Sequence, residues 1–460
     1  MSKTLQCISP IDGSVFAERP VLSLDEAAAR VGRAQHARHA WAARPLAERV
    51  ALVKAGIDRL GAMNDEIVPE LARMMGRPVR YGGEFGGVRE RTDYMAGIAA
   101  DALAPLVVEE SDAFRRFIAR EPHGVVLVVA PWNYPYLTAV NTIVPALMAG
   151  NAVIIKHATQ TLLVGERIAR AFHEAGVPQD VVQNVFLDHD TTAALISAGS
   201  FGFVNFTGSV AGGKAMEKAA AGSFTALGLE LGGKDPGYVA DDADLDWAVD
   251  VLVDGAMYNS GQCCCGIERI YVADKLYDAF VEKAVAVTRG YRLGSPLDPE
   301  TTIGPMASRR FADGVRRQIA DAVAAGARTH VERFAADDGG TYLTPQILTN
   351  VNHDMAVMRE ESFGPVVGIM KVSGDEEAIR LMNDSPYGLT ASLWTADPDR
   401  AEAIGRRIET GTVFQNRADY LDPALCWTGC TDTGRGGALS VIGFHNLTRP
   451  KSYHLRKRRP

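Results

Sequence analysis

Short apolar runs alternate with helix-like segments from residue 120 onward, and this pattern restricts the fold more than any other feature. The runs at 124–130, 152–156, 181–187 and 202–206 are rich in β-branched residues and have the length of strands. Strands that are apolar on both faces are typical of parallel sheets covered by helices on both sides. An α/β fold is therefore predicted.

The same alternation starts again in the second half of the chain. Residues 267–273 and 366–372 have the pattern of buried strands, and 275–289 and 376–383 follow them as predicted helices. A chain of 460 residues is long enough for two or three folding units. We therefore expect a second α/β domain, with the boundary near 228–232.

Two local patterns add to this outline. Ser23 and Glu26 have the spacing of a capping box, which predicts a helix that runs to about residue 43. Residues 113–121 alternate apolar and polar side chains. This alternation is typical of a strand with two different faces, and we expect it outside the main sheet, at a contact with another subunit.

Composition excludes several classes of protein. The 48 Lys and Arg residues against 56 Asp and Glu give a net charge of −8, which argues against a nucleic-acid partner. No run reaches the ~18 to 20 apolar residues of a membrane span, and the N-terminal residues lack the apolar core of a secretory signal. The six cysteines, three of them adjacent, do not form a disulfide pattern. A cytoplasmic protein with neither membrane nor nucleic acid as partner is expected, and the basic cluster at 456–459 is expected to be a solvated tail.

The three adjacent cysteines lie in the segment Gly-Gln-Cys-Cys-Cys at 261–265. Three interpretations are open from this segment alone: a buried structural cluster, a metal site, or a catalytic nucleophile that reacts as a thiolate. Metal binding is the weakest of these, because neighbouring thiolates cannot easily all face one ion and no Cys/His pair nearby has zinc-type spacing. No metal is expected.

The segment Glu-Leu-Gly-Gly-Lys at 230–234 lies at the expected domain junction. Glycines leave the backbone free, so the carboxylate of Glu230 can swing in a cleft and act as a general base. The alternative is an ordinary glutamate at the end of a strand, followed by a turn.

The segment Pro-Trp-Asn-Tyr-Pro at 131–135 directly follows a predicted strand. Open α/β sheets bind their ligands at the carboxyl ends of strands, and two prolines make this loop rigid. The amide of Asn133, held there, can donate a hydrogen bond to a developing oxyanion. The alternative is a structural turn.

The segment Phe-Thr-Gly-Ser-Val-Ala-Gly-Gly at 206–213 ends a strand and opens a helix. Glycines allow a phosphate to approach the backbone, and a helix N-terminus offers free N–H donors. The segment matches neither a Walker A motif nor a complete dinucleotide fingerprint, so alone it is a weak indication of a phosphate site.

Together and in this order, the four segments resemble one family, the aldehyde dehydrogenases. The resemblance extends from about Ser9 to about Lys451, and the ordered set favours the catalytic interpretation of the cysteine segment. Further matches lie at Lys156, 361–365 (Glu-Ser-Phe-Gly-Pro), 383–389 and 449–452 (Arg-Pro-Lys-Ser).

The resemblance implies a fold with three parts. A Rossmann-like dinucleotide-binding domain would comprise 1–103 and 123–229, and an α/β catalytic domain would comprise 230–440. A small β oligomerisation arm would comprise 104–122 and 441–460. A homodimer or homotetramer is expected.

The resemblance also implies a reaction. Cys264 would be the nucleophile, with Asn133 and the backbone N–H of Cys264 stabilising the alkoxide of the thiohemiacetal. Hydride transfer to NAD or NADP would leave a thioester, and Glu230 would activate the water that hydrolyses it to a carboxylic acid. Cys263 and Cys265 would be spectators or would protect Cys264 by reversible oxidation.

For the cofactor, the resemblance places Lys156 at the adenine-side ribose, Gly208 and Ser209 near the pyrophosphate, and Glu361 at the nicotinamide ribose. NAD-preferring members often carry a glutamate where this chain has Thr159, and a neutral side chain does not repel a 2′-phosphate. NADP is therefore expected to be accepted and even preferred. The complete set of expected cofactor residues is Trp132, Lys156, Thr159, Gly208, Ser209, Gly213, Leu231, Glu361 and Phe363.

This sequence departs from the family pattern at three positions. A basic residue common nine positions after Asn133 is replaced by Thr142. In the segment 429–438, the usual lysine and glutamate are replaced by Thr431 and Ala438. Because the lysine and glutamate are thought to relay the proton from the general base, their absence puts an efficient relay in doubt.

The expected substrate tunnel has largely aromatic walls, which favour an aliphatic or aromatic aldehyde. Relatives that oxidise succinate semialdehyde place an arginine in the helix after Pro-Trp-Asn, but no Arg or Lys occurs between Pro131 and Ile155. Arg417 is expected at the tunnel mouth and offers an alternative clamp, so succinate semialdehyde or a similar semialdehyde is the second candidate. The expected tunnel residues are Tyr134, Asn141, Tyr258, Arg417, Leu421 and Trp427.

Three alternatives come from other classes. A variant that releases acyl-CoA would not need the general base, so the presence of Glu230 argues for hydrolysis. A structural relative without activity would be expected to lack Cys264 or Asn133, and both are present. A thiol-based metal-binding protein is the third alternative, which metal analysis of the purified protein would test.

Overall fold

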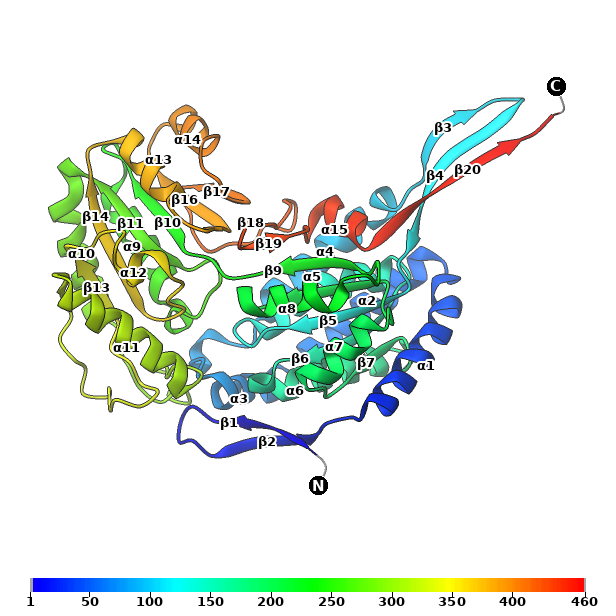
Figure 1. The fold of residues 1–460 in the computed structure, drawn as a ribbon, viewed down its shortest axis with the longest axis horizontal. Coiled ribbons are helices and arrows are strands. Elements are labelled where there is room, and N and C mark those ends of the chain that lie inside the picture. Colours follow the sequence, from blue (N-terminus) through cyan, green and yellow to red (C-terminus); the bar gives the residue numbers. More distant parts are fainter. Residues whose placement is uncertain (1–2, 459–460) are drawn as a thin grey trace.

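A computed structural model describes residues 3–458 (Figure 1). The expected terminal ranges include residues 1, 2, 459 and 460, which lie outside the described residues. The chain forms two large β-sheets, each packed against helices, and a smaller antiparallel sheet that projects from the body as an arm. The predicted α/β fold class is confirmed.

The first large sheet has six strands, in the order β19-β9-β8-β5-β6-β7. Its strands run parallel except β19, which pairs antiparallel with β9. In chain order the strands are β5 (Val125–Ala130), β6 (Ala152–His157), β7 (Val182–Asn184), β8 (Phe203–Thr207), β9 (Ala226–Glu230) and β19 (Gly434–Arg435).

Both faces of this sheet are covered, as the apolar runs predict. Val126 and Val128 face one helical layer, whereas Val125 and Leu127 face the other, because successive side chains of a strand point to opposite faces. The first layer contains α2 (Leu46–Gly61), α3 (Asn64–Met75), α4 (Phe85–Ala102), α5 (Pro135–Met148) and α6 (Leu162–Glu174). The second contains α1 (Leu24–Ala42), α7 (His189–Ser197) and α8 (Val210–Ala220).

The second large sheet has seven strands, in the order β12-β13-β14-β11-β10-β16-β17, and only β12 is antiparallel to its neighbour. The strands are β10 (Asp235–Val239), β11 (Ile267–Ala273), β12 (Arg328–Thr329), β13 (Gln346–Thr349), β14 (Val366–Val372), β16 (Thr390–Trp394) and β17 (Thr412–Gln415). Its helices are α9 (Leu245–Met257), α10 (Tyr277–Arg289), α11 (Arg309–Ala324), α12 (Ala356–Arg359), α13 (Asp375–Asn383) and α14 (Pro398–Gly405).

The arm consists of β3 (Leu106–Glu110), β4 (Phe114–Pro122) and β20 (Thr448–Arg456). Strand β4 coincides with the predicted two-faced strand and lies outside both large sheets. Leu106, Val107 and Val108 are exposed on the arm. An exposed apolar edge of this kind is a surface for pairing with another chain.

The structure differs from the expected domain ranges at two places. Strand β19 lies within 230–440 but pairs with β9 of the first sheet. Helix α15 (Ser440–Asn446) overlaps the expected arm range but packs against α4 and α5, because Phe444 and Leu447 belong to the core of the first domain.

Shorter elements complete the chain. They are the pair β1 (Thr4–Ile8) and β2 (Val15–Pro20), the pair β15 (Tyr387–Gly388) and β18 (Cys430–Thr431), and the 3-10 turns η1 (Val79–Tyr81), η2 (Thr159–Thr161), η3 (Tyr258–Gly261) and η4 (Asp274–Leu276). Ser23 and Glu26 form the predicted capping box at the start of α1. Across 3–458, every helix is too short or too polar to span a bilayer.

Candidate active site

The expected catalytic and cofactor residues of the first domain gather at one edge of its sheet. Strands β5, β6, β8 and β9 are parallel neighbours, so their carboxyl ends meet there. Asn133 follows β5, Lys156 lies at the end of β6, Ser209 follows β8, and Glu230 ends β9. Crevices at this edge of open α/β sheets are where ligands bind.

The cysteine segment is contributed by the second domain, between η3 and β11. Asn259 and Ser260 have left-handed backbone angles (φ 53° and 58°) just before it. At Gly261 (φ +67°) an added Cβ would lie 2.2 Å from the Gly364 carbonyl oxygen, so no other residue fits. The Gln262 side chain donates to the Asn259 carbonyl (3.1 Å) and accepts from Ala307 N (2.8 Å). These contacts hold a strained loop, a feature that clusters at functional sites.

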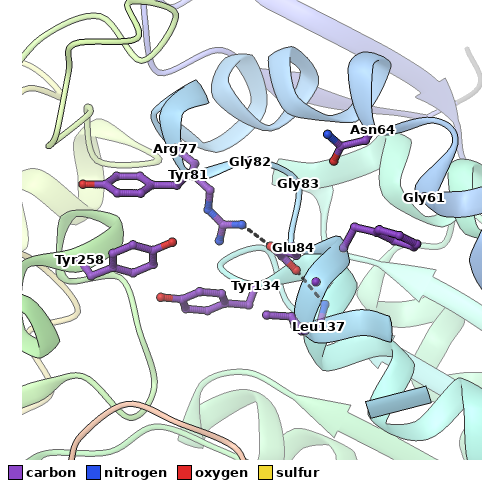
Figure 2. Close-up of a pocket in the computed structure, with 13 residues that line it drawn as sticks. Gly61, Asn64, Arg77, Tyr81, Gly82, Gly83, Glu84, Tyr134, Leu137 and Tyr258 are labelled. Carbon is purple, nitrogen blue, oxygen red and sulfur yellow. Dashed lines mark hydrogen bonds and ion pairs between the residues drawn. The ribbon is translucent and has the colours of Figure 1, made fainter. Parts of the chain in front are cut away.

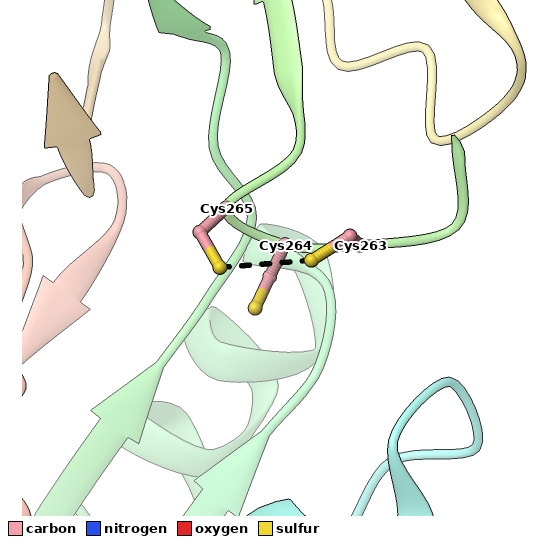
Figure 3. Close-up of side chains that lie close together, drawn as sticks. All are labelled: Cys263, Cys264 and Cys265. Atoms are coloured by element: carbon pink, nitrogen blue, oxygen red, sulfur yellow. Dashed lines mark hydrogen bonds between the residues drawn. The ribbon is translucent and has the colours of Figure 1, made fainter. Parts of the chain in front are cut away.

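The three cysteines are not equivalent (Figure 3). Their sulfur atoms lie within 4.8 Å of one another. Cys263 and Cys265 are buried, at 3% and 1% exposure, and both thiols donate to Oδ1 of Asp419, at 3.1 and 3.0 Å. Cys264 is only partly buried.

The environment also separates the pKa values of these thiols. The neighbouring thiols of Cys263 and Cys265 lower the pKa of Cys264, whereas the pKa values of Cys263 and Cys265 themselves are raised. A reactive cysteine needs both access and a stabilised thiolate. Cys264 is the cysteine of the three that has both.

Asn133 is 4% exposed and is held through its backbone. Its carbonyl accepts hydrogen bonds from Arg77 and from Nδ2 of Asn259 (3.2 Å). Arg77 forms a buried ion pair with Glu84, and the second oxygen of Glu84 accepts from Leu137 N (2.7 Å) in the first turn of α5 (Figure 2). The Asn133 side-chain amide has no hydrogen-bond partner within 3–458, so it remains free to bind a ligand.

Glu230 ends β9 and lies close enough to Cys264 for the two groups to influence each other's ionisation. Burial and, to a smaller extent, the nearby sulfur of Cys264 raise its pKa to about 8, although the positive charge of Arg91 opposes both effects. Glycine is required at position 233, because an added Cβ there would lie 2.6 Å from the backbone oxygen of Cys264. A carboxyl group with a pKa near the working pH suits a general base.

The loop that carries Glu361 is fixed by a buried carboxylate. Glu268 accepts from the backbone nitrogens of Ser362 (2.7 Å) and Phe363 (2.8 Å) and pairs with Nζ of Lys234 at 2.6 Å. Lys234 also donates to Oγ of Ser362 (2.9 Å). One ion pair therefore connects the Glu230 segment to the Glu361 loop.

Glu361 itself accepts from the backbone N–H of Gly233 at 3.1 Å. Burial and the negative charge of Glu268 together raise its pKa to about 8. Phe363 has a left-handed backbone (φ 48°), and its ring packs edge-on against Trp132, with 5.5 Å between the ring centroids. Of the expected nicotinamide-side residues, Trp132 and Phe363 are thus in contact with each other, and Glu361 contacts the segment that follows Glu230.

The expected adenine-side residues lie along the first sheet. Lys156 is 7% exposed and has no carboxylate within ion-pair distance among the described residues, and burial lowers its pKa. Thr159 opens η2, two residues beyond β6. Ser209 caps α8 by accepting from Gly212 N (3.2 Å), and an added Cβ at Gly213 would lie 2.6 Å from Leu231. A buried lysine without a counter-ion and a capped helix start fit the phosphate and ribose groups of a dinucleotide.

Several of the expected tunnel residues pack in the same core as Cys264. Tyr134, Leu421 and Trp427 belong to the same apolar cluster as Cys264. Tyr134 and Tyr258 line a cavity of about 650 Å³, together with Arg77 and Leu137 (Figure 2). Asn141 is buried on α5.

Arg417 differs from the other expected tunnel residues. Its side chain is exposed, and its guanidinium carbon lies 3.6 Å from the ring centroid of Tyr420. Tyr420 in turn donates to Glu90 of α4 at 2.6 Å. Arg417 therefore lies on the outer surface of the loop that carries Leu421, and it is stacked on an aromatic ring.

The sequence motifs did not predict four charged residues that lie at the site. Arg77, Glu84 and Arg91 come from the helical region before the first motif, and Asp419 follows β17. No spacing pattern connects them to the reacting groups. Their burial can be recognised only once the fold brings these segments together.

Comparison with known proteins identifies the class. Residues 1–453 match the family model described as the aldehyde dehydrogenase family. The chain is 32% identical over 447 residues to a succinate-semialdehyde dehydrogenase [NADP(+)] of Deinococcus radiodurans, covering 96% of this chain and 93% of the relative. It is 34% identical over 391 residues to succinate semialdehyde dehydrogenase [NAD(P)+] Sad of Escherichia coli K12, covering 84% of each.

Solved structures agree. A structure described as giving insights into cofactor and substrate selection by Gox0499 superposes with a TM-score of 0.93 at 33% identity, covering 98% of this chain and 99% of that one. PnpE in complex with nicotinamide adenine dinucleotide superposes with a TM-score of 0.94 at 30% identity, covering 100% and 95%. The chain belongs to the aldehyde dehydrogenase family, and it is an enzyme of the oxidoreductase class.

Proposed function

We propose that the protein oxidises an aldehyde to the corresponding carboxylic acid with NAD or NADP as hydride acceptor. The observation that carries this proposal is the convergence of Cys264, Asn133 and Glu230 at the junction of the two domains. Cys264 has the lowered pKa, Asn133 has a free amide on a fixed backbone, and Glu230 has a carboxyl group whose pKa lies near 8.

Cys264 begins the reaction as a thiolate, which attacks the aldehyde carbon. The negative charge then moves to the carbonyl oxygen, where the amide of Asn133 and the backbone N–H of Cys264 donate hydrogen bonds. Donors of this kind contribute about 3 to 4 kcal/mol to transition-state stabilisation. Cys263 and Cys265 remain protonated, since Asp419 accepts from both.

The nicotinamide, when bound, supplies the acceptor for the hydride that leaves the thiohemiacetal carbon. Trp132, Phe363 and Glu361 would hold its ring and ribose, Gly208, Ser209, Gly213 and Leu231 would line its path, and Lys156 and Thr159 would contact the adenine-side ribose. Because Thr159 is neutral and Lys156 is not neutralised by a carboxylate, a 2′-phosphate is tolerated, and NADP is accepted.

Glu230 completes the cycle. Loss of the hydride leaves a thioester on Cys264, and Glu230 takes a proton from the water that attacks it. The carboxylic acid leaves and the thiolate is regenerated. The positive charge of Arg91 acts on this base, because it opposes the rise in the pKa of Glu230.

The substrate has two candidates. Tyr134, Tyr258, Leu421 and Trp427 favour an aldehyde with an apolar body. A semialdehyde is favoured by a different observation, the buried positive charge of Arg91 beside Asn141, and relatives at 32–34% identity are named for succinate semialdehyde.

An aldehyde panel tests the proposed function. Hexanal, benzaldehyde and succinate semialdehyde are offered with NAD and with NADP, and reduced nicotinamide is followed by absorbance. We expect turnover in wild type and none in Cys264→Ala. Absence of turnover with every aldehyde and both cofactors would contradict the proposal, as would full activity in the variant.

A further inference from the structure

Arg91 is a buried cation that the sequence motifs do not explain. It lies on α4, is 8% exposed, and has no carboxylate within ion-pair distance in the part of the chain that the structure describes. Burying a charge without a counter-charge is costly, and natural proteins rarely retain such a group without a function.

The hydrogen bonds of Arg91 are incomplete. Only Nη1 has acceptors, the carbonyl of Leu137 at 2.8 Å and Oδ1 of Asn141 at 3.0 Å. Nε and Nη2 have no acceptor among the described residues. Arg269 shows the contrast: it is 1% exposed and uses Nε, Nη1 and Nη2 on oxygen atoms of the chain, as expected of a structural arginine.

Asn141 provides a second, independent observation. Its side chain is 2% exposed, and its Nδ2 is fully buried without any hydrogen-bond partner. Buried amide donors are usually satisfied, so Nδ2 of Asn141 is a donor that a bound ligand can use. Nδ2 of Asn141 and the free nitrogens of Arg91 are all donors, and the ligand that matches them is an anion.

Arg91 lies directly behind one wall of the cavity that Tyr134 lines. Leu137, whose carbonyl binds Arg91, lines the cavity beside Tyr134. Burial lowers the pKa of Arg91, and the carboxyl group of Glu84 opposes this shift most strongly, followed by Cys265 and Glu230. Arg91 is therefore near the cysteine segment and near the general base.

Other cations at the site are already engaged. Arg77 is paired with Glu84 and donates to the Asn133 carbonyl, and Arg417 is exposed and stacked on Tyr420. The helix after Pro-Trp-Asn carries no basic residue. Arg91 therefore brings a positive charge to that helix from α4.

We propose that Arg91 and Asn141 bind the distal carboxylate of the substrate, so that the enzyme prefers short aldehydes with an anionic end over uncharged aldehydes. This inference rests on the proposed function, because the aldehyde carbon must reach Cys264 while the carboxylate is held. Arginine and amide donors together match a carboxylate by charge and by hydrogen-bond geometry. Semialdehydes of three to five carbons are the substrate class.

The test compares succinate semialdehyde with its methyl ester, which has the same aldehyde and backbone but no charge. We expect wild-type kcat/KM to favour the acid by about 10- to 150-fold, which is the range given by hydrogen bonds to a charged group. In Arg91→Met this ratio should fall to near one, and Arg91→Lys should recover part of it. Arg89→Met is the matched control, because Arg89 is exposed on the same helix and pairs with Asp58.

Two results would overturn the inference without touching the proposed function. One is a wild-type ratio at or below one while both aldehydes are oxidised. The other is an equal loss on acid and ester in Arg91→Met, which would mean that Arg91 serves Glu230 rather than the substrate. If no aldehyde is oxidised at all, the proposed function itself is wrong.

A second variant and a binding measurement cover the case in which Arg91→Met does not fold. Asn141→Leu should lower the acid-to-ester ratio by about three- to tenfold, since one donor to the charged group is lost. Succinate should inhibit wild-type oxidation of hexanal competitively, whereas butyramide of similar size should not. Equal inhibition by the two compounds would contradict an anion site.

Discussion

The ionisation of Glu230 makes a quantitative prediction about the hydrolysis step. Burial in the cleft, with the sulfur of Cys264 close by, raises the pKa of its carboxyl group to about 8. Only the deprotonated form can accept a proton from water. With a pKa of about 8, about 9% of the enzyme is in the active form at pH 7 and about 91% at pH 9, so the hydrolysis rate should rise roughly tenfold.

Hydrolysis can be isolated from the earlier steps by rapid-quench kinetics. The enzyme is mixed with one equivalent of aldehyde and excess NADP, and release of the carboxylic acid is followed separately from reduction of the nicotinamide. Acid release should rise with pH through a midpoint near 8, whereas Glu230→Gln should form the thioester and release acid slowly at every pH. A midpoint near 4.5, or the same pH profile in Glu230→Gln, would refute the assignment of Glu230 as the base.

Arg91 supplies an internal check on the cause of this shift. Because its positive charge opposes the rise in the pKa of Glu230, Arg91→Met should move the midpoint of acid release to higher pH. The direction is fixed by the sign of the charge. Movement to lower pH would show that the two groups do not interact as the structure indicates.

Four further outcomes follow from the structure. In steady-state kinetics, kcat/KM for NAD should exceed that for NADP by no more than about tenfold, and Thr159→Glu should shift the preference toward NAD by at least about tenfold, because a carboxylate repels the 2′-phosphate. Asn133→Ala should lower kcat by about 100- to 1000-fold while the folded state keeps its stability in urea. Lys234→Met should reduce the free energy of unfolding by about 3 to 5 kcal/mol in urea denaturation, because Glu268 is left buried without its partner. Glu230→Gln should be more stable to urea than wild type at pH 9 but not at pH 4. The reason is that the folded state keeps the Glu230 proton up to about pH 8, whereas the unfolded chain loses it near pH 4.5. If the difference in unfolding free energy between variant and wild type is the same at both pH values, the raised pKa is contradicted.

The elements of the fold were predictable where periodicity is strong. The apolar runs at 124–130 and 267–273 correspond to β5 and β11, and the capping box at Ser23 marks the start of α1. These features are local, because a few neighbouring residues decide them. Strand β7 is shorter than the run at 181–187, since only Val182–Asn184 pairs with β6.

The positions of the expected site segments in the fold were predictable because each segment follows a strand or precedes one. The supporting charges were not. In the sequence, nothing distinguishes Arg91 from the other charged residues of its helix. Only the packing of α4 against α5 brings its side chain to Asn141. Asp419 likewise becomes a partner of Cys263 and Cys265 only when the loop after β17 covers the cysteine segment.

The metal-binding alternative also depends on this cluster. Three sulfur atoms within 4.8 Å and the carboxylate of Asp419 are a set of ligands that zinc accepts. The proposed function requires that Cys264 be free to attack a carbonyl. Metal analysis of the purified enzyme should therefore find less than one zinc per chain, and a stoichiometric ion that abolishes activity on removal would revive the alternative.

The most direct test of the whole account is to identify the atom that bonds to the substrate. Glu230→Gln is mixed with aldehyde and NADP, quenched in acid and digested, and the peptide containing 261–265 is sequenced by mass spectrometry. We predict one acyl group per chain, carried by the sulfur of Cys264. An unmodified peptide, or an acyl group on Cys263 or Cys265, would contradict the account.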